Sequence, residues 1–149
     1  MRTLLLAGAL ACFSLGAAMA DPAEDALKAK AIACIRSAAP EVTAKAESLS
    51  DAVNVLVDAL CAVQVGRLAA YDANARTLAD WQGRSSPAQL AGVALDPLTG
   101  ELATPPGFKM EWDSSSAELG ELKRVTPREE LNVVAAQAVI AARKPAGGQ

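Results

Sequence analysis

The fold depends on one stretch of the chain, AESLSDAVNVLVDALC, which spans residues 46–61. Within this stretch and its flanks, apolar residues recur at alternating intervals of four and three: Val42, Ala46, Leu49, Val53, Leu56, Leu60 and Val63. This spacing places them on one face of an α-helix. A shifted stripe then continues through residues 68–78. The pattern therefore predicts helix over about residues 41–82, with the stripe facing the core.

The same stretch carries a signal that would interrupt this helix. Ser48 is followed three residues later by Asp51, the spacing of a capping residue and its partner at a helix start. Cys34 and Cys61 give a second reason, because in an unbroken antiparallel hairpin they would lie some 20 Å apart. A disulfide needs Cα atoms within about 7 Å of each other. We favour a break at Ser48–Asp51 with the disulfide formed; the alternative is one continuous helix in which these cysteines do not pair within the chain.

The two cysteines are interpreted as a structural pair. They are the only cysteines after residue 20, and an exported chain usually pairs an even number of cysteines. Their spacing is unlike C-x-x-C, so a redox role is not indicated. Closing a loop of this size is worth about 3.6 kcal/mol in the chain-entropy model.

Two further helices are delimited by clear start signals. The first follows Asp21 and Pro22, a capping residue and a proline at the first helical position. It is expected to cover about residues 22–38, because the residue before Pro40 avoids the helical region. The last helix starts after Thr126 and is expected over 127–143, with residues 145–149 as a loose tail.

The last helix is apolar almost all round, since only Asn132 and Gln137 are polar between residues 131 and 142. Such a helix must be buried on most sides. It is either the central helix of the domain or half buried here and half in a partner, which would be another envelope protein or a second copy. We also expect it to cover the distal part of the long helix, residues 68–81.

Between the helices, the pattern changes to a minor β element over about residues 93–113. Asp96, Pro97 and Gly100 are typical of a turn between two short strands. Residues 108–113 alternate apolar and charged residues, which suits a half-buried strand. A short helix is expected over 116–124. The fold class predicted for the single domain, residues 21–144, is mainly α: a small disulfide-stapled helical bundle with a minor β-hairpin element.

The first twenty residues read as a secretory signal peptide. Arg2 precedes an uncharged apolar run, and Ala18-Met19-Ala20 is a typical cleavage signal. The run is shorter than the roughly 20 residues that a membrane-spanning helix needs. A lipid attachment at Cys12 is the less favoured alternative. We expect a periplasmic or secreted bacterial protein, cut after Ala20, with no transmembrane segment in the mature chain.

Composition excludes several functions. Histidine is absent and the net charge is −3, so we expect neither His-based catalysis nor a His-ligated metal, and no nucleic-acid partner. No cofactor site, metal site or catalytic residue is assigned. Four carboxylates near Trp112 could serve a small envelope hydrolase: Glu111, Asp113, Glu118 and Glu121. A solvated acidic face explains them better.

A row of three apolar side chains, Phe108, Met110 and Trp112, is a possible binding surface. We favour a role in covering the long helix. The leading functional interpretation is an exported, non-enzymatic helical protein with a binding or structural role in the bacterial cell envelope. The alternatives are the hydrolase and a subunit of a larger envelope assembly that self-associates or binds a partner through the last helix. The sequence does not name a ligand, a biological process or an oligomeric state.

Overall fold

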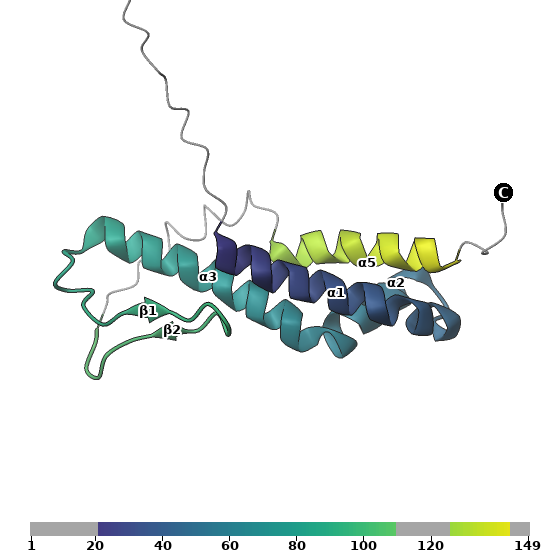
Figure 1. Cartoon of the computed structure of the whole chain (residues 1–149), viewed down its shortest axis with the longest axis horizontal. Coiled ribbons are helices and arrows are strands. Elements are labelled where there is room, and N and C mark those ends of the chain that lie inside the picture. The colour runs from purple at the N-terminus through teal and green to yellow at the C-terminus, as the bar shows by residue number, and fades with distance from the viewer. Residues whose placement is uncertain (1–20, 110–125, 144–149) are drawn as a thin grey trace, which may run out of the picture.

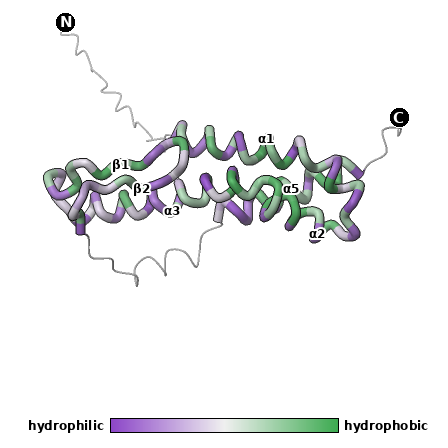
Figure 2. The backbone as a smooth tube through the Cα atoms, turned by 90° about the horizontal axis from the view of Figure 1, so that it is seen from below, coloured by the Kyte–Doolittle hydropathy of each residue, from purple (hydrophilic) through white to green (hydrophobic). Residues whose placement is uncertain are grey.

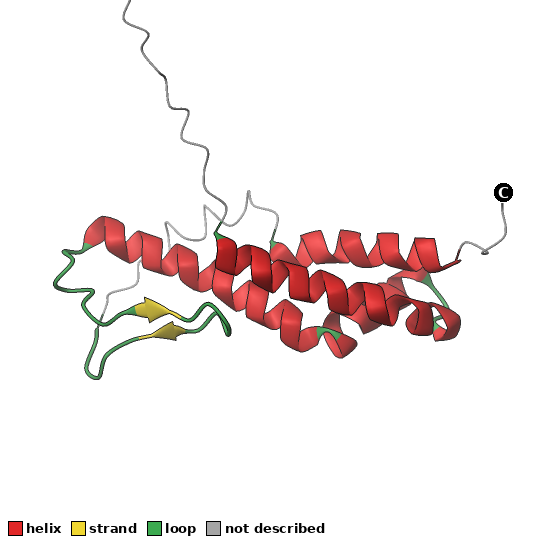
Figure 3. Ribbon diagram, viewed as in Figure 1, coloured by secondary structure: helices red, strands yellow, loops and turns green. Residues whose placement is uncertain are grey.

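The computed structural model describes residues 21–109 and 126–143. The elements in chain order are α1 (Pro22–Lys45), α2 (Leu49–Asn54), the π-helical segment η1 (Val55–Leu60), α3 (Ala62–Arg84), β1 (Ala94–Leu95), β2 (Leu102–Ala103) and α5 (Pro127–Arg143). Helices α1, α3 and α5 run along the long axis of the molecule, with α2 at one end and the two strands at the other (Figure 1). Figure 3 shows the small share of strand beside the helices. The predicted class, a mainly α bundle with a minor β-hairpin, is confirmed.

Helix α1 begins as predicted and ends later than predicted. The Asp21 carboxylate accepts a hydrogen bond from the Ala23 N–H at 2.9 Å, which caps the helix. The predicted end at residue 38 is wrong, because α1 continues through Pro40 to Lys45. A proline inside a helix loses one hydrogen bond and crowds the preceding turn. Ala39 and Val42, which flank Pro40, are buried in the core, and this burial offsets the cost.

The chain reverses where Ser48 predicted it. After α1, Ala46 takes an extended conformation, and the Ser48 side chain accepts a hydrogen bond from the Asp51 N–H at 3.0 Å to cap α2. The predicted continuous helix over residues 41–82 is therefore wrong, and the favoured break is confirmed. A second break at Cys61 was not predicted: Leu49–Leu60 and Ala62–Arg84 are bent by 76° relative to each other.

The disulfide between Cys34 and Cys61 closes this reversal. The two sulfur atoms are 2.03 Å apart and the Cα atoms 5.9 Å apart, within the range of disulfides. Cys61 is fully buried. The predicted pairing is confirmed, and it links α1 to the point where η1 meets α3.

The core lies between α1, α5 and the segment that runs from α2 into α3. The apolar stripe predicted for residues 42–63 reaches it only in part. Val42 and Leu56 are buried, whereas Leu60 and Val63 are 53% and 61% exposed. A π-helix repeats its hydrogen bonds at intervals of five residues, and the Cys61 N–H accordingly donates to the Leu56 carbonyl at 2.9 Å. This longer interval turns Leu60 and Val63 out of the core.

Helix α5 has the predicted bounds and a different environment from the one predicted. Its inner face, Leu131, Ala135 and Val139, is fully buried against α1, α2 and part of α3. On its outer face Val133 is 57% and Ile140 47% exposed. The interpretation of α5 as a central helix buried on most sides is therefore wrong.

The distal end of α3 lies beside the hairpin instead of under α5 (Figure 1), so the expectation that α5 covers residues 68–81 is wrong for that end. Strands β1 and β2 pair antiparallel, with Ala94 opposite Ala103 and Leu95 opposite Leu102. The Asn74 side chain donates to the Gly100 carbonyl at 2.7 Å, which fixes the hairpin turn to α3.

Several predictions fall wholly or partly outside the described residues. Phe108 and Lys109 are not in a strand, so the strand predicted over 108–113 is wrong at its start, and its remainder is outside. The helix over 116–124, the tail over 145–149 and the signal peptide are outside as well.

Within residues 21–109 and 126–143, no single helix has both the length and the apolar composition to cross a membrane. The bent pair of Leu49–Leu60 and Ala62–Arg84 passes when taken together, on length and composition alone.

Candidate functional site: an apolar groove beside the disulfide

The most distinctive surface lies at the end of the bundle where the chain reverses. A groove of about 280 Å³, here called the corner groove, runs between the end of α1 and the α2–η1 segment. Its lining residues are Glu41, Val42, Lys45, Ala46, Asp51, Val55 and Leu60. They come from the end of α1 and from the α2–η1 segment, which the reversal at Ser48 brings together. The groove is therefore a product of the tertiary fold.

The wall of the corner groove is an exposed apolar edge. Leu60 is 53% and Val55 37% exposed, and Val63, three residues after Leu60, is 61% exposed. Single exposed apolar residues are ordinary on protein surfaces. Here two of them line one concave surface with Val42 and Ala46 beside them, and grouped exposed apolar side chains mark interaction sites.

The backbone that carries this edge is held on both sides. The Cys34 sulfur lies 3.9 Å from the Leu60 carbonyl oxygen, and the disulfide ties the next residue, Cys61, to α1. The π-helical segment adds a local departure from regular helix, a feature that is frequent at functional sites. Leu60 is thus presented from a covalently fixed position, and a surface fixed in advance loses less entropy on binding.

Charged groups stand at the rim of the corner groove. Lys45 donates to the Glu41 carboxylate at 2.7 Å, an exposed pair one helical turn apart. This hydrogen bond and the charge of Lys45 lower the pKa of Glu41. Asp51 lies on the opposite side, at the start of α2. A partner protein can form polar contacts with the charged groups of the rim and bury an apolar side chain against the wall.

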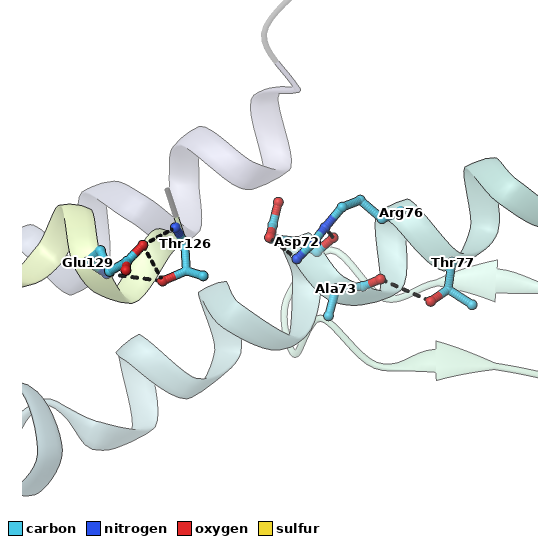
Figure 4. Close-up of polar contacts among 6 residues, drawn as sticks. All are labelled: Asp72, Ala73, Arg76, Thr77, Thr126 and Glu129. Carbon is cyan, nitrogen blue, oxygen red and sulfur yellow. Dashed lines mark hydrogen bonds and ion pairs between the residues drawn. The ribbon is translucent and has the colours of Figure 1, made fainter. Parts of the chain in front are cut away.

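The polar contacts elsewhere on the described residues support the fold. Asp72 is only 3% exposed and pairs with Arg76 at 2.5 Å, one turn further along α3 (Figure 4). The same figure shows Thr126 and Glu129 at the start of α5, where the Thr126 N–H donates to the Glu129 carboxylate at 2.7 Å. In return, the Glu129 N–H donates to the Thr126 hydroxyl at 3.3 Å, so the two residues cap the helix reciprocally.

Tyr71 connects three parts of the chain. Its hydroxyl donates to the Asp21 carboxylate at 2.5 Å, and this hydrogen bond, with burial, raises the pKa of Tyr71 to about 12. The same hydrogen bond lowers the pKa of Asp21. The backbone of Tyr71 also faces Gly100 of the hairpin turn. The tyrosine therefore holds the start of α1 and the hairpin on α3.

The residues proposed from the sequence are only partly described. Phe108 packs on Trp81 of α3 with ring centroids 5.2 Å apart, in line with a role in covering the long helix. Met110 and Trp112, as well as the four carboxylates Glu111, Asp113, Glu118 and Glu121, lie outside the described residues. The structure brings Cys34 and Cys61 together, and the binding surface proposed around Phe108 stays a prediction.

Asp96 acts in the hairpin turn. Its carboxylate accepts a hydrogen bond from the Leu98 N–H at 2.7 Å, and this bond is the main reason why the pKa of Asp96 is lowered. Among the described residues no group of three or more Cys, Asp or Glu side chains is arranged to hold a metal ion. The side chain is thus used in the way that turn chemistry predicts.

The corner groove was missed at the level of sequence because Leu60 and Val63 were assigned to the core stripe. The signal that could have found it is the disulfide. Adjacent residues of a helix point about 100° apart, so a Cys61 that must reach Cys34 turns Leu60 away from the same direction. The predicted Cys34–Cys61 disulfide and a Leu60 side chain directed into the core were therefore incompatible predictions.

Comparisons of the chain with protein-family models, curated proteins and solved structures found no significant match.

Proposed function

We propose that this chain is an exported, non-enzymatic protein of the bacterial cell envelope that binds another protein through the corner groove. The observation that carries the proposal is the position of Leu60, which is 53% exposed on the wall of a groove directly beside the disulfide. An apolar side chain held there supplies the kind of central buried contact on which protein interfaces depend.

Export is supported by the residues before Asp21 and by the disulfide. The signal-peptide pattern ends at Ala20, and disulfides persist in the periplasm and outside the cell. An oxidising compartment would keep the corner closed, and so would keep Leu60 in its exposed position. N-terminal sequencing of the exported form should begin Asp-Pro-Ala-Glu; a retained Met1 or a lipidated Cys12 would contradict this part of the proposal.

A binding role fits the chemistry of the groove. Its wall and floor are aliphatic, and its polar groups are an exposed ion pair and one further carboxylate at the rim. Such a surface suits an apolar side chain of a partner protein flanked by polar contacts.

The test compares two exposed leucines. Leu60→Asp and Leu98→Asp place the same charge on side chains of similar exposure, 53% and 64%, the first on the wall of the corner groove and the second in the turn between β1 and β2. Tagged forms of the full chain are expressed in the native cells and purified from the envelope fraction without reductant. Wild type and Leu98→Asp are expected to retain the same partner in equal yield, and Leu60→Asp is expected to lose it at least tenfold.

Both variants should melt within a few degrees of the wild type, because neither leucine is buried in the core. Equal retention by Leu60→Asp, or equal loss by Leu98→Asp, would overturn the assignment of the corner groove.

A further inference from the structure

The bend at Cys61 has no local cause in its own sequence. The helical segments Leu49–Leu60 and Ala62–Arg84 are bent by 76° relative to each other. Sharp bends in helices occur at proline, at glycine or serine pairs, or at an inserted wide turn, and residues 55–62 contain no proline, glycine or serine. Among the described residues, no side-chain hydrogen bond caps the start of α3. The feature that coincides with the bend is the bond from Cys61 to Cys34 of α1.

The turn before the bend departs from the register that a regular helix would give it. In an α-helix, Leu60 would point about 40° away from Leu56 and Cys61 about 140° away from it, because successive residues turn by about 100°. The structure has the reverse arrangement: Leu56 and Cys61 are fully buried, and Leu60 is 53% exposed. The wide turn of η1, in which the Cys61 N–H donates to the Leu56 carbonyl at 2.9 Å, produces this exchange.

The disulfide is the contact that requires this arrangement. Its two Cα atoms lie 5.9 Å apart, so Cys61 has to face α1, where a regular turn would direct it elsewhere. Leucine has a larger apolar surface than cysteine and therefore gains more free energy on burial. The apolar stripe over residues 42–63 favours the same outcome, because it places Leu60 on the core side of a regular helix. Without the bond, both preferences turn Leu60 inward and Cys61 outward.

The rest of the bundle can stay in place during this exchange. Leu56 of η1 and Val65 and Leu68 of α3 are buried in the shared core, and α3 also packs along α1. Cys61 lies outside helical geometry, with φ −106° and ψ 12°, so this junction can take up the extra residue of the wide turn. Figure 2 shows α2 beside the end of α1, where the chain has turned back. Only the turn between α2 and α3 has to change.

We propose that the Cys34–Cys61 disulfide is a redox switch for the corner groove. In the bonded form Leu60 stands on the groove wall with Val55. In the dithiol form Leu60 turns into the core and the wall is lost. The consequence for binding rests on the proposed function, whereas the turn of Leu60 does not. This role differs from that of a C-x-x-C pair, because the bond controls the conformation of its own chain.

The switch is operated by an external dithiol or disulfide. On reduction, a thiolate of a small dithiol attacks the Cys34 sulfur, because Cys34 is partly buried and Cys61 is fully buried. The Cys34–Cys61 bond breaks, Cys61 leaves as a thiolate and takes up a proton, and Cys34 is held in a mixed disulfide with the reagent. The second thiolate of the dithiol then attacks the reagent's own sulfur in that bond, which releases Cys34 as a thiolate that is protonated in turn. The dithiol becomes a cyclic disulfide, and oxidation by a disulfide reagent reverses these steps.

The exposure of Leu60 can be measured without any partner. In the purified protein with ¹³C-labelled leucine methyl groups, a soluble gadolinium chelate broadens the signals of exposed methyls, and Leu60→Ile identifies the Leu60 signal. In the bonded form, Leu60 should be broadened like Leu98, which is 64% exposed, and Leu56 should be protected. After reduction with a dithiol, the broadening of Leu60 should fall at least fivefold, whereas Leu98 and Leu56 should not change.

The matched variant replaces both Cys34 and Cys61 by alanine, which removes the bond without reductant and leaves no thiol to react elsewhere. Its Leu60 signal should be protected in the presence and in the absence of dithiol. Circular dichroism should show that the helix content is kept. A Leu60 signal that is broadened equally in all forms overturns the proposal, because packing alone would then set the register. Loss of helix on reduction overturns it as well, because the bond would then be a staple only.

Purification from the envelope fraction separates this proposal from the proposed function. The double alanine variant is expected to retain the partner at least tenfold less than the wild type, as Leu60→Asp does. A variant in which Leu60 is protected and the partner is still retained contradicts the binding role of the corner groove and leaves the conformational switch in place. A variant in which Leu60 stays exposed overturns the switch and leaves the binding role in place.

Discussion

The two ends of the molecule are built by different means. At the corner end, a covalent bond joins α1 to the start of α3, and the fully buried residues Ile35, Leu56 and Val57 lie in the same core. At the hairpin end, α3 extends beyond α1 and α5 and is covered by a short hairpin held by Gly100, Tyr71 and the contact of Trp81 with Phe108. The covalently fixed end carries an exposed apolar groove, whereas the hairpin end uses its aromatic rings for internal packing.

The disulfide offsets a loss of stability at the corner end. Apolar side chains that stay in water do not contribute the free energy of burial, and the disulfide supplies stability at the end where they are exposed. The hairpin end has no disulfide among its described residues. Its hydrogen bonds and aromatic contacts attach the hairpin to α3.

The largest expected effect is the loss of the covalent bond. Replacing Cys34 and Cys61 together by serine should lower the free energy of unfolding by about 2–5 kcal/mol. The reason is that the open chain gains conformational freedom when unfolded. Urea denaturation followed by circular dichroism measures the change.

The control is the wild type in reductant, which should lose a similar amount. An unchanged unfolding midpoint in both would show that the corner is held by packing alone.

A substitution at Gly100 should disrupt the attachment of the hairpin to α3. This residue has a φ of +77°, and a Cβ atom there would come within 2.5 Å of the Tyr71 nitrogen and 2.6 Å of the Arg67 oxygen. Gly100→Ala should therefore push the hairpin off α3 and cost about 1–3 kcal/mol. Amide exchange should accelerate over residues 93–103 and stay unchanged at the corner end.

Gly107→Ala is the matched control, since Gly107 has a similar φ of +80° with nothing within 4 Å of the added carbon. It carries only the cost of the left-handed conformation, about 1 kcal/mol. Equal exchange in the two variants would mean that the close approach at Gly100 does not hold the hairpin.

A smaller effect is expected from Tyr71→Phe, which keeps the ring and removes the hydrogen bond to Asp21. The loss should be about 1 kcal/mol. Because the pKa of Tyr71 is raised from 10.0 to about 12, the stabilisation is complete below pH 10 and disappears as the pH rises through 12. Because the pKa of Asp21 is lowered from 3.8, it is present above pH 3.8 and disappears as the pH falls below the lowered value.

The difference in unfolding free energy between wild type and Tyr71→Phe should thus be constant between about pH 5 and 9 and shrink on both sides. Denaturation at a series of pH values gives this profile. A difference that grows below pH 4 or above pH 11 would contradict the role assigned to this contact.

The sequence predicted those parts of the fold that depend on local chemistry. The caps at Asp21, Ser48 and Thr126 mark the starts of α1, α2 and α5 because a capping side chain acts on its own first turn. The disulfide was predicted from the number of cysteines after residue 20 and from the largest Cα–Cα distance that a disulfide can span. The turn at Asp96 followed from turn chemistry.

The predictions that were wrong concern features that depend on packing between elements. Pro40 is tolerated because Ala39 and Val42 are buried, which cannot be read from the proline itself. The π-helical segment shifted the apolar stripe, so Leu60 left the core and the corner groove was not predicted. Helix α5 packs against α1, α2 and part of α3, and its own apolar pattern does not specify these neighbours.

We propose that the corner end, and not the hairpin end, is the binding end of the molecule. Site-specific photo-crosslinking in intact cells tests it, with the same photoreactive residue placed at Leu60 or at Leu98. We expect one discrete crosslinked product from position 60, which disappears when the protein also carries Val55→Asp, and no discrete product from position 98. A product from position 98 alone, or the same product from both positions, would contradict it.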